Sequence, residues 1–302
     1  MNTLQITTGF KKELWEFKKT LIWVPIIIAI MMILAPVVPI LLADNFQFSM
    51  AIDKLSMAQD NAHLRFFAVG VQSAMTAVFT PFIMVSLIIQ LFYFTSCLFD
   101  ERRDLSIFFW RSLPVSDAQT IATKLVTGAL LIPAVFMLAA TAVVLIALVL
   151  IFIASIVLSV GYDISLWAYW AEADIISNLA SIWVNLLPYA LWLFPIYAWL
   201  MLTSMFANKA PFLWAVLPVI VLLLIESFIV AYFRLNSPFI SNTLVGYLQF
   251  TSDLLPGSLS SYESPKTALF TALSGKLSII ATLIGCGFMY LTYWLRINRS
   301  EG

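Results

Sequence analysis

The chain has 302 residues, of which 62% are hydrophobic and 11% are charged, and its 16 Lys and Arg residues balance 16 Asp and Glu residues. Soluble globular proteins contain about 45–50% apolar and about 25% charged residues. The composition therefore excludes a soluble enzyme and a disordered protein, and the zero net charge argues against a nucleic-acid-binding protein. Because the apolar stretches lack the alternation of membrane barrel strands, the sequence predicts an all-α polytopic membrane protein.

Six stretches are nearly free of charge and long enough to cross a bilayer. They are Thr20–Ala43, Phe66–Phe99, Leu125–Tyr162, Ile175–Asn208, Ala210–Phe233 and Leu277–Leu295. A helix needs roughly 17–25 residues to cross about 30 Å of hydrocarbon, where it also satisfies its own backbone. The sequence therefore predicts six transmembrane helices in a single transmembrane domain that covers residues 1–302.

Residues 3–19 precede the first of these stretches. Phe10, Leu14 and Phe17 recur at helical spacing, with Lys and Glu residues between them. This pattern predicts an amphipathic helix that lies in the membrane interface; a plain charged tail is the alternative. No small-x-small cleavage site ends a short apolar core, so we interpret the first stretch as a retained span rather than a signal peptide.

The orientation follows from the basic residues. Most Lys and Arg residues lie in the N-terminal segment, in residues 100–124, in the turn at 208–211 and at the C-terminus. The positive-inside rule places these segments in the cytoplasm. The sequence therefore predicts two cytoplasmic termini and a multi-pass protein of the cell's inner (cytoplasmic) membrane.

The stretch Leu125–Tyr162 admits two interpretations, a single long helix or a tight hairpin. A hairpin would place Asp163–Asp174, which contains acids but no base, in the cytoplasm, and would move Arg296 and Arg299 outside. Because this conflicts with the positive-inside rule, we favour one long helix that extends beyond the bilayer.

Residues 100–124 form the only sizeable loop expected on the cytoplasmic side. Its first half, Asp100–Arg111, has charges beside an aromatic and aliphatic stripe, and Pro114 ends this element. Ser116 is placed to cap a second short helix, and Lys124 lies where the chain returns to the membrane. A short amphipathic helix between two long spans can transmit force from a cytoplasmic partner; a surface connector without a partner is the alternative.

The loop contains the run Asp100-Glu101-Arg102-Arg103, the turn Ser112-Leu113-Pro114-Val115-Ser116 and then Lys124. Together these motifs resemble the type-2 ABC exporter (ABC-2) permeases, in which an acid–Arg pair follows the second span, a similar turn comes next, and a Lys opens the third span. The short helix before the first span and the long loop between spans five and six also match. Asp104-Leu105 departs from the small Gly-Thr-like pair that members often carry.

The resemblance implies the membrane subunit of an ABC transporter, which dimerises with an identical or paralogous permease subunit through spans two and five. Two separate ATPase subunits would bind ATP and Mg, so the resemblance implies no cofactor in this chain. Export is the family's usual direction, membrane lipid is the other expected partner, and no nucleic acid is expected. The residues expected to couple to the ATPase are Glu101, Arg102, Arg103, Phe108, Trp110 and Arg111.

The sequence contains no recognisable catalytic motif. It lacks a Walker motif, a G-x-S-x-G elbow and an H-E-x-x-H pair, and His63 is its sole histidine. We therefore predict no enzymatic activity, no catalytic residue and no metal site. Apolar and aromatic spans favour a hydrophobic or amphiphilic cargo, such as a lipid, a drug or a peptide. The alternatives are an ATP-independent carrier, channel or scaffold and a membrane-embedded enzyme.

Glu226 is the only charged residue deep in a predicted span. It lies about 22 Å along the helix from Pro211, at 1.5 Å per residue, and so in the outer part of the bilayer. The loop of residues 234–275 follows, and its prolines divide it into short pieces that could fold over the outer mouth. We predict that Glu226 and Arg234 stabilise this outer gate, with Glu226 accepting hydrogen bonds from the cover or from Arg234. Proton or substrate binding by Glu226 is the alternative.

Overall fold

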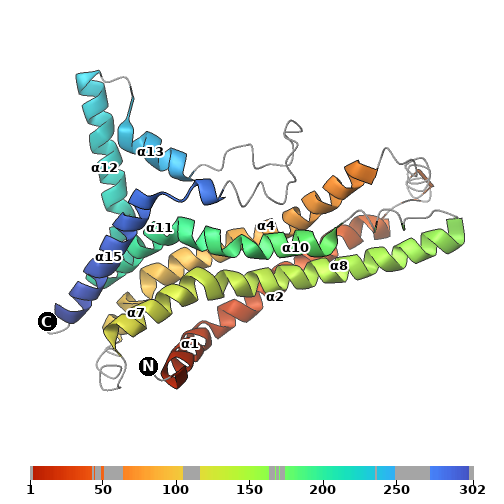
Figure 1. Cartoon of the computed structure of the whole chain (residues 1–302), viewed down its shortest axis with the longest axis horizontal. Coiled ribbons are helices and arrows are strands. Elements are labelled where there is room, and N and C mark those ends of the chain that lie inside the picture. Colours follow the sequence, from red (N-terminus) through yellow and green to blue (C-terminus); the bar gives the residue numbers. More distant parts are fainter. Residues whose placement is uncertain are drawn as a thin grey trace. The chain divides into compact units, whose positions relative to one another are not determined.

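The computed structural model describes residues 3–42, 44, 49–50, 64–104, 116–162, 167, 170, 174–234, 237–248 and 273–298. Within these ranges the regular elements are all helices, and no strand occurs (Figure 1). The predicted all-α class is therefore confirmed.

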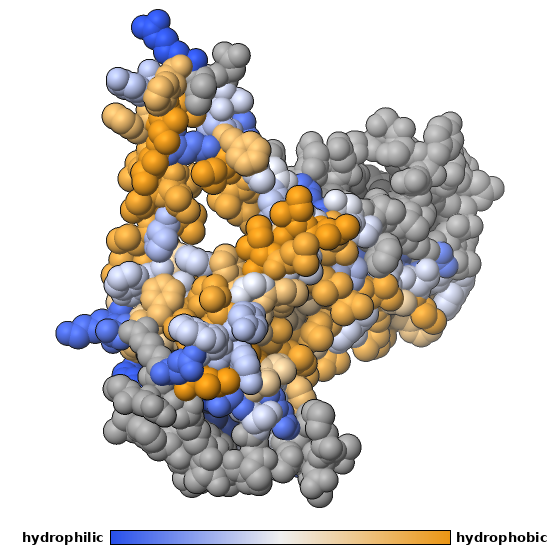
Figure 2. Space-filling view, turned by 60° about the vertical axis from the view of Figure 1, so that its left-hand side comes forward, coloured by the Kyte–Doolittle hydropathy of each residue, from blue (hydrophilic) through white to orange (hydrophobic). Residues whose placement is uncertain are grey.

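Six helical segments are long and apolar enough to cross a membrane. They are Lys18–Pro39, Ser73–Arg103, Asp117–Tyr162, Ile175–Phe206, Pro211–Phe233 and Ile279–Asn298. Each overlaps one predicted stretch, so the prediction of six spans is confirmed. Apolar side chains cover most of the described surface that is visible in Figure 2, as expected where helices face lipid. The chain is thus a multi-pass membrane protein.

The N-terminal half begins with two helices joined at a turn. Helix α1 (Thr3–Glu16) ends one residue before the turn at Phe17, and α2 (Lys18–Leu42) forms the first span. The second span comprises α4 (Leu64–Ser96) and the short helix α5 (Phe99–Arg103). The helix predicted before the first span is therefore present.

The third span is one continuous run of three elements. Helix α7 (Asp117–Val126) passes into the π-helical segment η2 (Thr127–Leu131) and then into α8 (Ile132–Tyr162). The long-helix interpretation is therefore confirmed, and the hairpin is excluded. Ser116 also caps α7 as predicted, because its Oγ accepts a hydrogen bond of 3.2 Å from the Gln119 amide.

The C-terminal half contains the remaining spans. Helices α10 (Ile175–Val184) and α11 (Leu186–Phe206), separated by a turn at Asn185, form the fourth span. Helices α12 (Pro211–Phe233) and α15 (Ile279–Asn298) form the fifth and sixth, and the short α13 (Phe239–Leu248) follows α12.

The chain forms two compact units, each built from separate stretches of sequence. Unit 1 comprises Met1–Glu16, Ile88–Ile132 and Asn185–Gly302, and unit 2 comprises Phe17–Leu87 and Pro133–Val184. In unit 2 the Trp183 indole donates a hydrogen bond of 3.1 Å to Thr141 Oγ1, which joins α10 to α8. The candidate sites described below all lie in unit 1.

The core of unit 1 contains a close contact between an aromatic ring and the π-helical segment. The Phe94 ring stacks on Tyr197 at 4.4 Å between centroids and lies against Gly128 of η2, where a Cβ would come within 2.3 Å of Phe94 Cζ. Gln90 Nε2 donates a hydrogen bond of 2.9 Å to the Gly128 carbonyl, and the Tyr189 hydroxyl donates one of 3.0 Å to Gln90 Oε1. These contacts hold spans two, three and four together beside the candidate site.

Candidate functional site

Six charged side chains from four helices meet within unit 1. Three are cations and three are carboxylates, so their formal charges cancel; we call this group the charge cluster. Its members are Lys12 and Glu13 of α1, Glu101 of α5, Asp117 and Lys124 of α7, and Arg296 of α15.

Lys124 lies at the centre of the charge cluster. Its ammonium is 2.9 Å from Glu13 Oε1 and 3.1 Å from Glu101 Oε1, and its side chain is only 3% exposed. The Lys12 ammonium is 3.2 Å from Glu101 Oε1 and 3.8 Å from Glu13 Oε1. Two ammonium groups thus bridge the same two carboxylates and connect α1, α5 and α7.

Arg296 adds the sixth span to the charge cluster. Its Nη1 is 3.2 Å from Glu101 Oε2, and its Nε donates to Asp117 Oδ1 at 2.7 Å. The remaining Glu13 oxygen, Oε2, accepts a hydrogen bond of 2.8 Å from the Tyr93 hydroxyl. Both oxygens of the two most buried carboxylates are therefore satisfied.

The charge cluster can be buried because each of its buried carboxylates is completely paired. Removing an ion from water costs several kcal/mol, and only good geometry with additional hydrogen bonds offsets this cost. Losing one partner leaves the opposite charge buried and uncompensated. The charge cluster is therefore a rigid joint between four helices.

The charge cluster anchors both ends of the predicted cytoplasmic loop. Glu101 lies in α5, at the start of this loop, and Asp117 begins α7, the helix that contains its last part; both bind Arg296. A displacement of the loop would thus reach α15 directly and α1 through Lys12. Within the described ranges, no three His, Cys, Asp or Glu side chains could jointly hold a metal ion. The complete pairing of its carboxylates makes the charge cluster suited to fixing the positions of these helices.

Arg102 and Arg103 have different environments although they are adjacent. Arg102 Nη2 donates hydrogen bonds to the carbonyls of Ser204, at 3.0 Å, and Ala207, at 2.6 Å, at the end of α11. A basic side chain that binds the last carbonyls of a helix stabilises that end. Arg103 is 61% exposed and pairs with Asp100 at 3.3 Å and Asp104 at 3.1 Å.

The predicted coupling residues that the structure describes differ in their exposure. Glu101 is 6% exposed and committed to three cations within the chain, and Arg102 is directed to α11, so neither forms an open surface. Of the charged coupling residues that the structure describes, only Arg103 is exposed. Phe108, Trp110 and Arg111 lie outside the described residues.

Sequence analysis did not identify most of the charge cluster. The sequence pattern places Glu13 on the polar face of an interfacial helix, Lys124 in the motif shared with the ABC-2 permeases, and Arg296 among the basic residues that orient the chain. The available signal is positional, because the six members lie at the same predicted side of four spans, the first, second, third and sixth. Acidic and basic residues that lie at the same depth in the membrane, at the ends of several helices, are candidates for ion pairs with one another.

The second predicted site concerns Glu226 and α13. The Glu226 carboxylate accepts a hydrogen bond from the Ser241 amide at 2.8 Å and a second one from the Ile240 amide. Both amides belong to the first turn of α13, where N–H groups lack partners and the helix dipole favours an anion. The predicted hydrogen bonds to Glu226 are therefore present. Arg234, the other residue predicted at this gate, is described as well, and among the described residues it forms no ion pair with Glu226.

Helix α13 is also attached to α11. The Trp192 indole donates to the Tyr247 carbonyl at 3.2 Å, and the Tyr247 hydroxyl donates to the Trp192 carbonyl. Glu226 thus fixes the first turn of α13, and Tyr247 fixes its last turn. That this short helix opens and closes a pathway is a prediction.

We expect Glu226→Gln to loosen α13. The amide keeps the size of the carboxylate but loses its charge and one acceptor oxygen, so an amide of the first turn is left without its partner, at a cost of about 1–3 kcal/mol. Hydrogen–deuterium exchange of residues 239–248 in nanodiscs should become faster. Asp174→Asn, at an exposed acid, is the matched control and should leave that exchange unchanged. Unchanged exchange in the Glu226 variant would contradict this role.

Comparisons with protein-family models, with curated proteins and with solved structures gave no match to this chain. The geometry and the sequence motifs are therefore the basis of the functional proposal.

Proposed function

We propose that this chain is the permease subunit of an ATP-driven ABC transporter that exports a hydrophobic or amphiphilic solute. The observation that carries the proposal is the double attachment of the loop between α5 and α7. Glu101 before the loop and Asp117 after it both bind Arg296, and Lys124 joins the same helices to α1. A cytoplasmic ATPase that moves this loop would move three spans and the N-terminal helix together.

The sequence motifs supply the second argument. The acid–Arg run at residues 100–103, the Ser-Leu-Pro-Val-Ser turn and Lys124 resemble the ABC-2 permeases. The resemblance and the proposal require an ATPase subunit that binds ATP and Mg and a second permease subunit. The inner membrane is the proposed location.

The proposal predicts that a stand-alone ATPase co-purifies with the chain in mild detergent. Its ATPase rate should rise when both subunits share a nanodisc, because the permease couples nucleotide-driven closure to the spans. A chain that transports its solute at full rate without any ATPase would instead be a carrier or a channel. A scaffold would bind partners without moving any solute.

We expect Arg103→Glu to weaken the ATPase complex by about tenfold while the chain still inserts and folds. Reversing an exposed interface charge replaces attraction with repulsion, and tenfold corresponds to about 1.4 kcal/mol. Pull-down titration and ATPase stimulation measure the effect, with Lys209→Glu, at another exposed cation, as the control.

Arg102 is less suitable for this test, because its substitution would also remove the hydrogen bonds to the end of α11. Trp110→Ala probes the aromatic half of the loop separately. If binding and stimulation survive both Arg103→Glu and Trp110→Ala, the loop is not the docking surface.

A further inference from the structure

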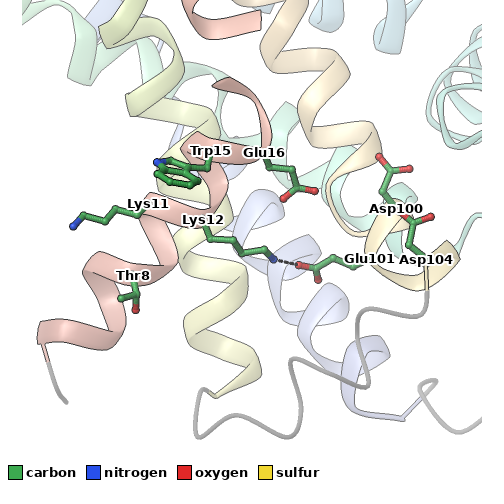
Figure 3. A pocket seen from close by; sticks show the side chains of 8 residues that line it. All are labelled: Thr8, Lys11, Lys12, Trp15, Glu16, Asp100, Glu101 and Asp104. Atoms are coloured by element: carbon green, nitrogen blue, oxygen red, sulfur yellow. Dashed lines mark hydrogen bonds and ion pairs between the residues drawn. The ribbon is translucent and has the colours of Figure 1, made fainter. Parts of the chain in front are cut away.

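A cavity of about 760 Å³ opens between α1 and the α5 end of the second span, within unit 1. Figure 3 shows its two walls, with the side chains of α1 on one side and those of α5 and the residue after it on the other. Its lining residues are Thr8, Lys11, Lys12, Trp15, Glu16, Asp100, Glu101 and Asp104.

Part of the charge in this cavity is already committed within the chain. Lys12 and Glu101 point toward one another across the cavity and pair at 3.2 Å (Figure 3). Asp100 and Asp104 share the single guanidinium of Arg103, which does not line the cavity. Among the described residues, one cation therefore serves these two carboxylates, which leaves one negative charge without a balancing cation.

The remaining charged groups of the lining are Glu16 and Lys11, both on α1. Glu16 adds a further carboxylate on the side of α1 that faces Asp100 in Figure 3. Lys11 supplies an exposed ammonium on the same helix. The carboxylates are suited to an ammonium group of an occupant, and Lys11, whose side chain extends away from Asp100 in Figure 3, is suited to an anionic group of the same occupant.

The level of the cavity in the membrane follows from Trp15. This indole is 78% exposed and lies three residues before Lys18, where the first span begins. Tryptophan concentrates at the membrane–water interface, where its ring lies among the headgroups. The cavity mouth beside Trp15 is consequently at the depth of lipid phosphates and amines.

We propose that this cavity binds the headgroup of a phospholipid that carries a primary amine, namely phosphatidylethanolamine. Its ammonium donates hydrogen bonds to the carboxylates of Glu16 and Asp100, its phosphate lies near Lys11, and Trp15 packs against its glycerol region. Phosphatidylcholine lacks the N–H donors, and phosphatidylglycerol would add a net negative charge beside the acids. The inference does not depend on an ATPase partner.

The test measures lipid retention by the delipidated full-length chain with native mass spectrometry. Ethanolamine, choline and glycerol phospholipids with identical acyl chains are added at equal concentration. We expect phosphatidylethanolamine to be preferred over the other two on the order of tenfold, as one charge-assisted hydrogen bond allows. The double variant Glu16→Gln/Asp100→Asn should lose this preference, and Lys11→Gln should weaken binding of both zwitterionic lipids.

Matched controls are Asp174→Asn and Lys209→Gln, which change exposed charges away from the cavity lining and should keep the preference. An ethanolamine lipid with a photoreactive headgroup should label peptides within residues 8–16 or 100–104 of the unmodified chain, a result that does not depend on the folding of any variant. Equal retention of the three lipids, or labelling only elsewhere, overturns the proposal. Displacement by equimolar soluble phosphoethanolamine would show that a small solute rather than a lipid occupies the cavity and would overturn it too.

Discussion

Replacing Lys124 by methionine should destabilise the protein more than any other single charge removal that we consider. Lys124 is the central cation of the charge cluster, and its loss leaves Glu13 with one cation, Lys12 at 3.8 Å, besides the hydrogen bond from the Tyr93 hydroxyl. Breaking a buried pair by removing one partner costs about 3–5 kcal/mol, because the opposite charge stays buried. We therefore expect an apparent melting temperature lower by on the order of 10 °C in detergent.

A second substitution should partly restore the stability that Lys124→Met removes. Adding Glu13→Gln to Lys124→Met restores a neutral charge cluster, and the new amide oxygen can still accept the hydrogen bond from Tyr93. The double variant should therefore be more stable than the sum of the two single effects implies, as expected for residues in direct contact. Lys209→Met, at an exposed cation, is the control and should leave the melting temperature within about 1 °C. Strictly additive effects would show that the charge cluster is not energetically coupled.

The features that can be predicted from the sequence are those that a single physical effect determines. The spans follow from the absence of charge over helical lengths, because no alternative structure satisfies the backbone in lipid. The single long helix over Leu125–Tyr162 follows from charge asymmetry, and the cap at Ser116 follows from local hydrogen bonding. The spans and the cap depend on residues that are close in sequence, whereas the long helix depends on the charge balance of the two sides of the membrane.

The charge cluster could not be derived in this way, since its pairs form between distant segments. Lys124 and Glu13 are separated by 111 positions, and Arg296 and Glu101 by 195. Sequence analysis placed Glu101 on a partner-facing surface because it lies in a charged run. In α5, residues two positions apart point about 200° away from each other, so Glu101 is buried while Arg103 is exposed.

The π-helical segment shows an intermediate case. In η2 the Ile132 amide bonds to the Thr127 carbonyl, five residues earlier. Pro133 is next and has no N–H for the corresponding carbonyl of Gly128, and Gln90 supplies the missing donor at 2.9 Å. Pro133 is visible in the sequence, but the donor that replaces its missing N–H comes from another span and has no local signal.

Gly128→Ala should cause the second largest loss of stability that we predict. The added Cβ would lie 2.3 Å from Phe94 Cζ and within 2.8 Å of both neighbouring ring carbons. The ring cannot easily withdraw, because it stacks on Tyr197 at 4.4 Å and meets the edge of Tyr93 at 5.4 Å. Overpacking of this kind costs about 1–3 kcal/mol, and it should appear as a lower melting temperature and faster hydrogen exchange around η2.

The control and the rescue for this variant lie within the same part of the chain. Gly161 belongs to the same continuous helix, but a Cβ there meets nothing within 4 Å, so Gly161→Ala should be neutral or slightly stabilising. Phe94→Leu shortens the obstructing ring, and its combination with Gly128→Ala should lose less stability than the two single losses added together. If Gly128→Ala melts like Gly161→Ala, the close contact between Phe94 and η2 does not exist in the folded protein. If it is destabilised but Phe94→Leu gives no rescue, the loss arises from the altered π-helical backbone rather than from the ring.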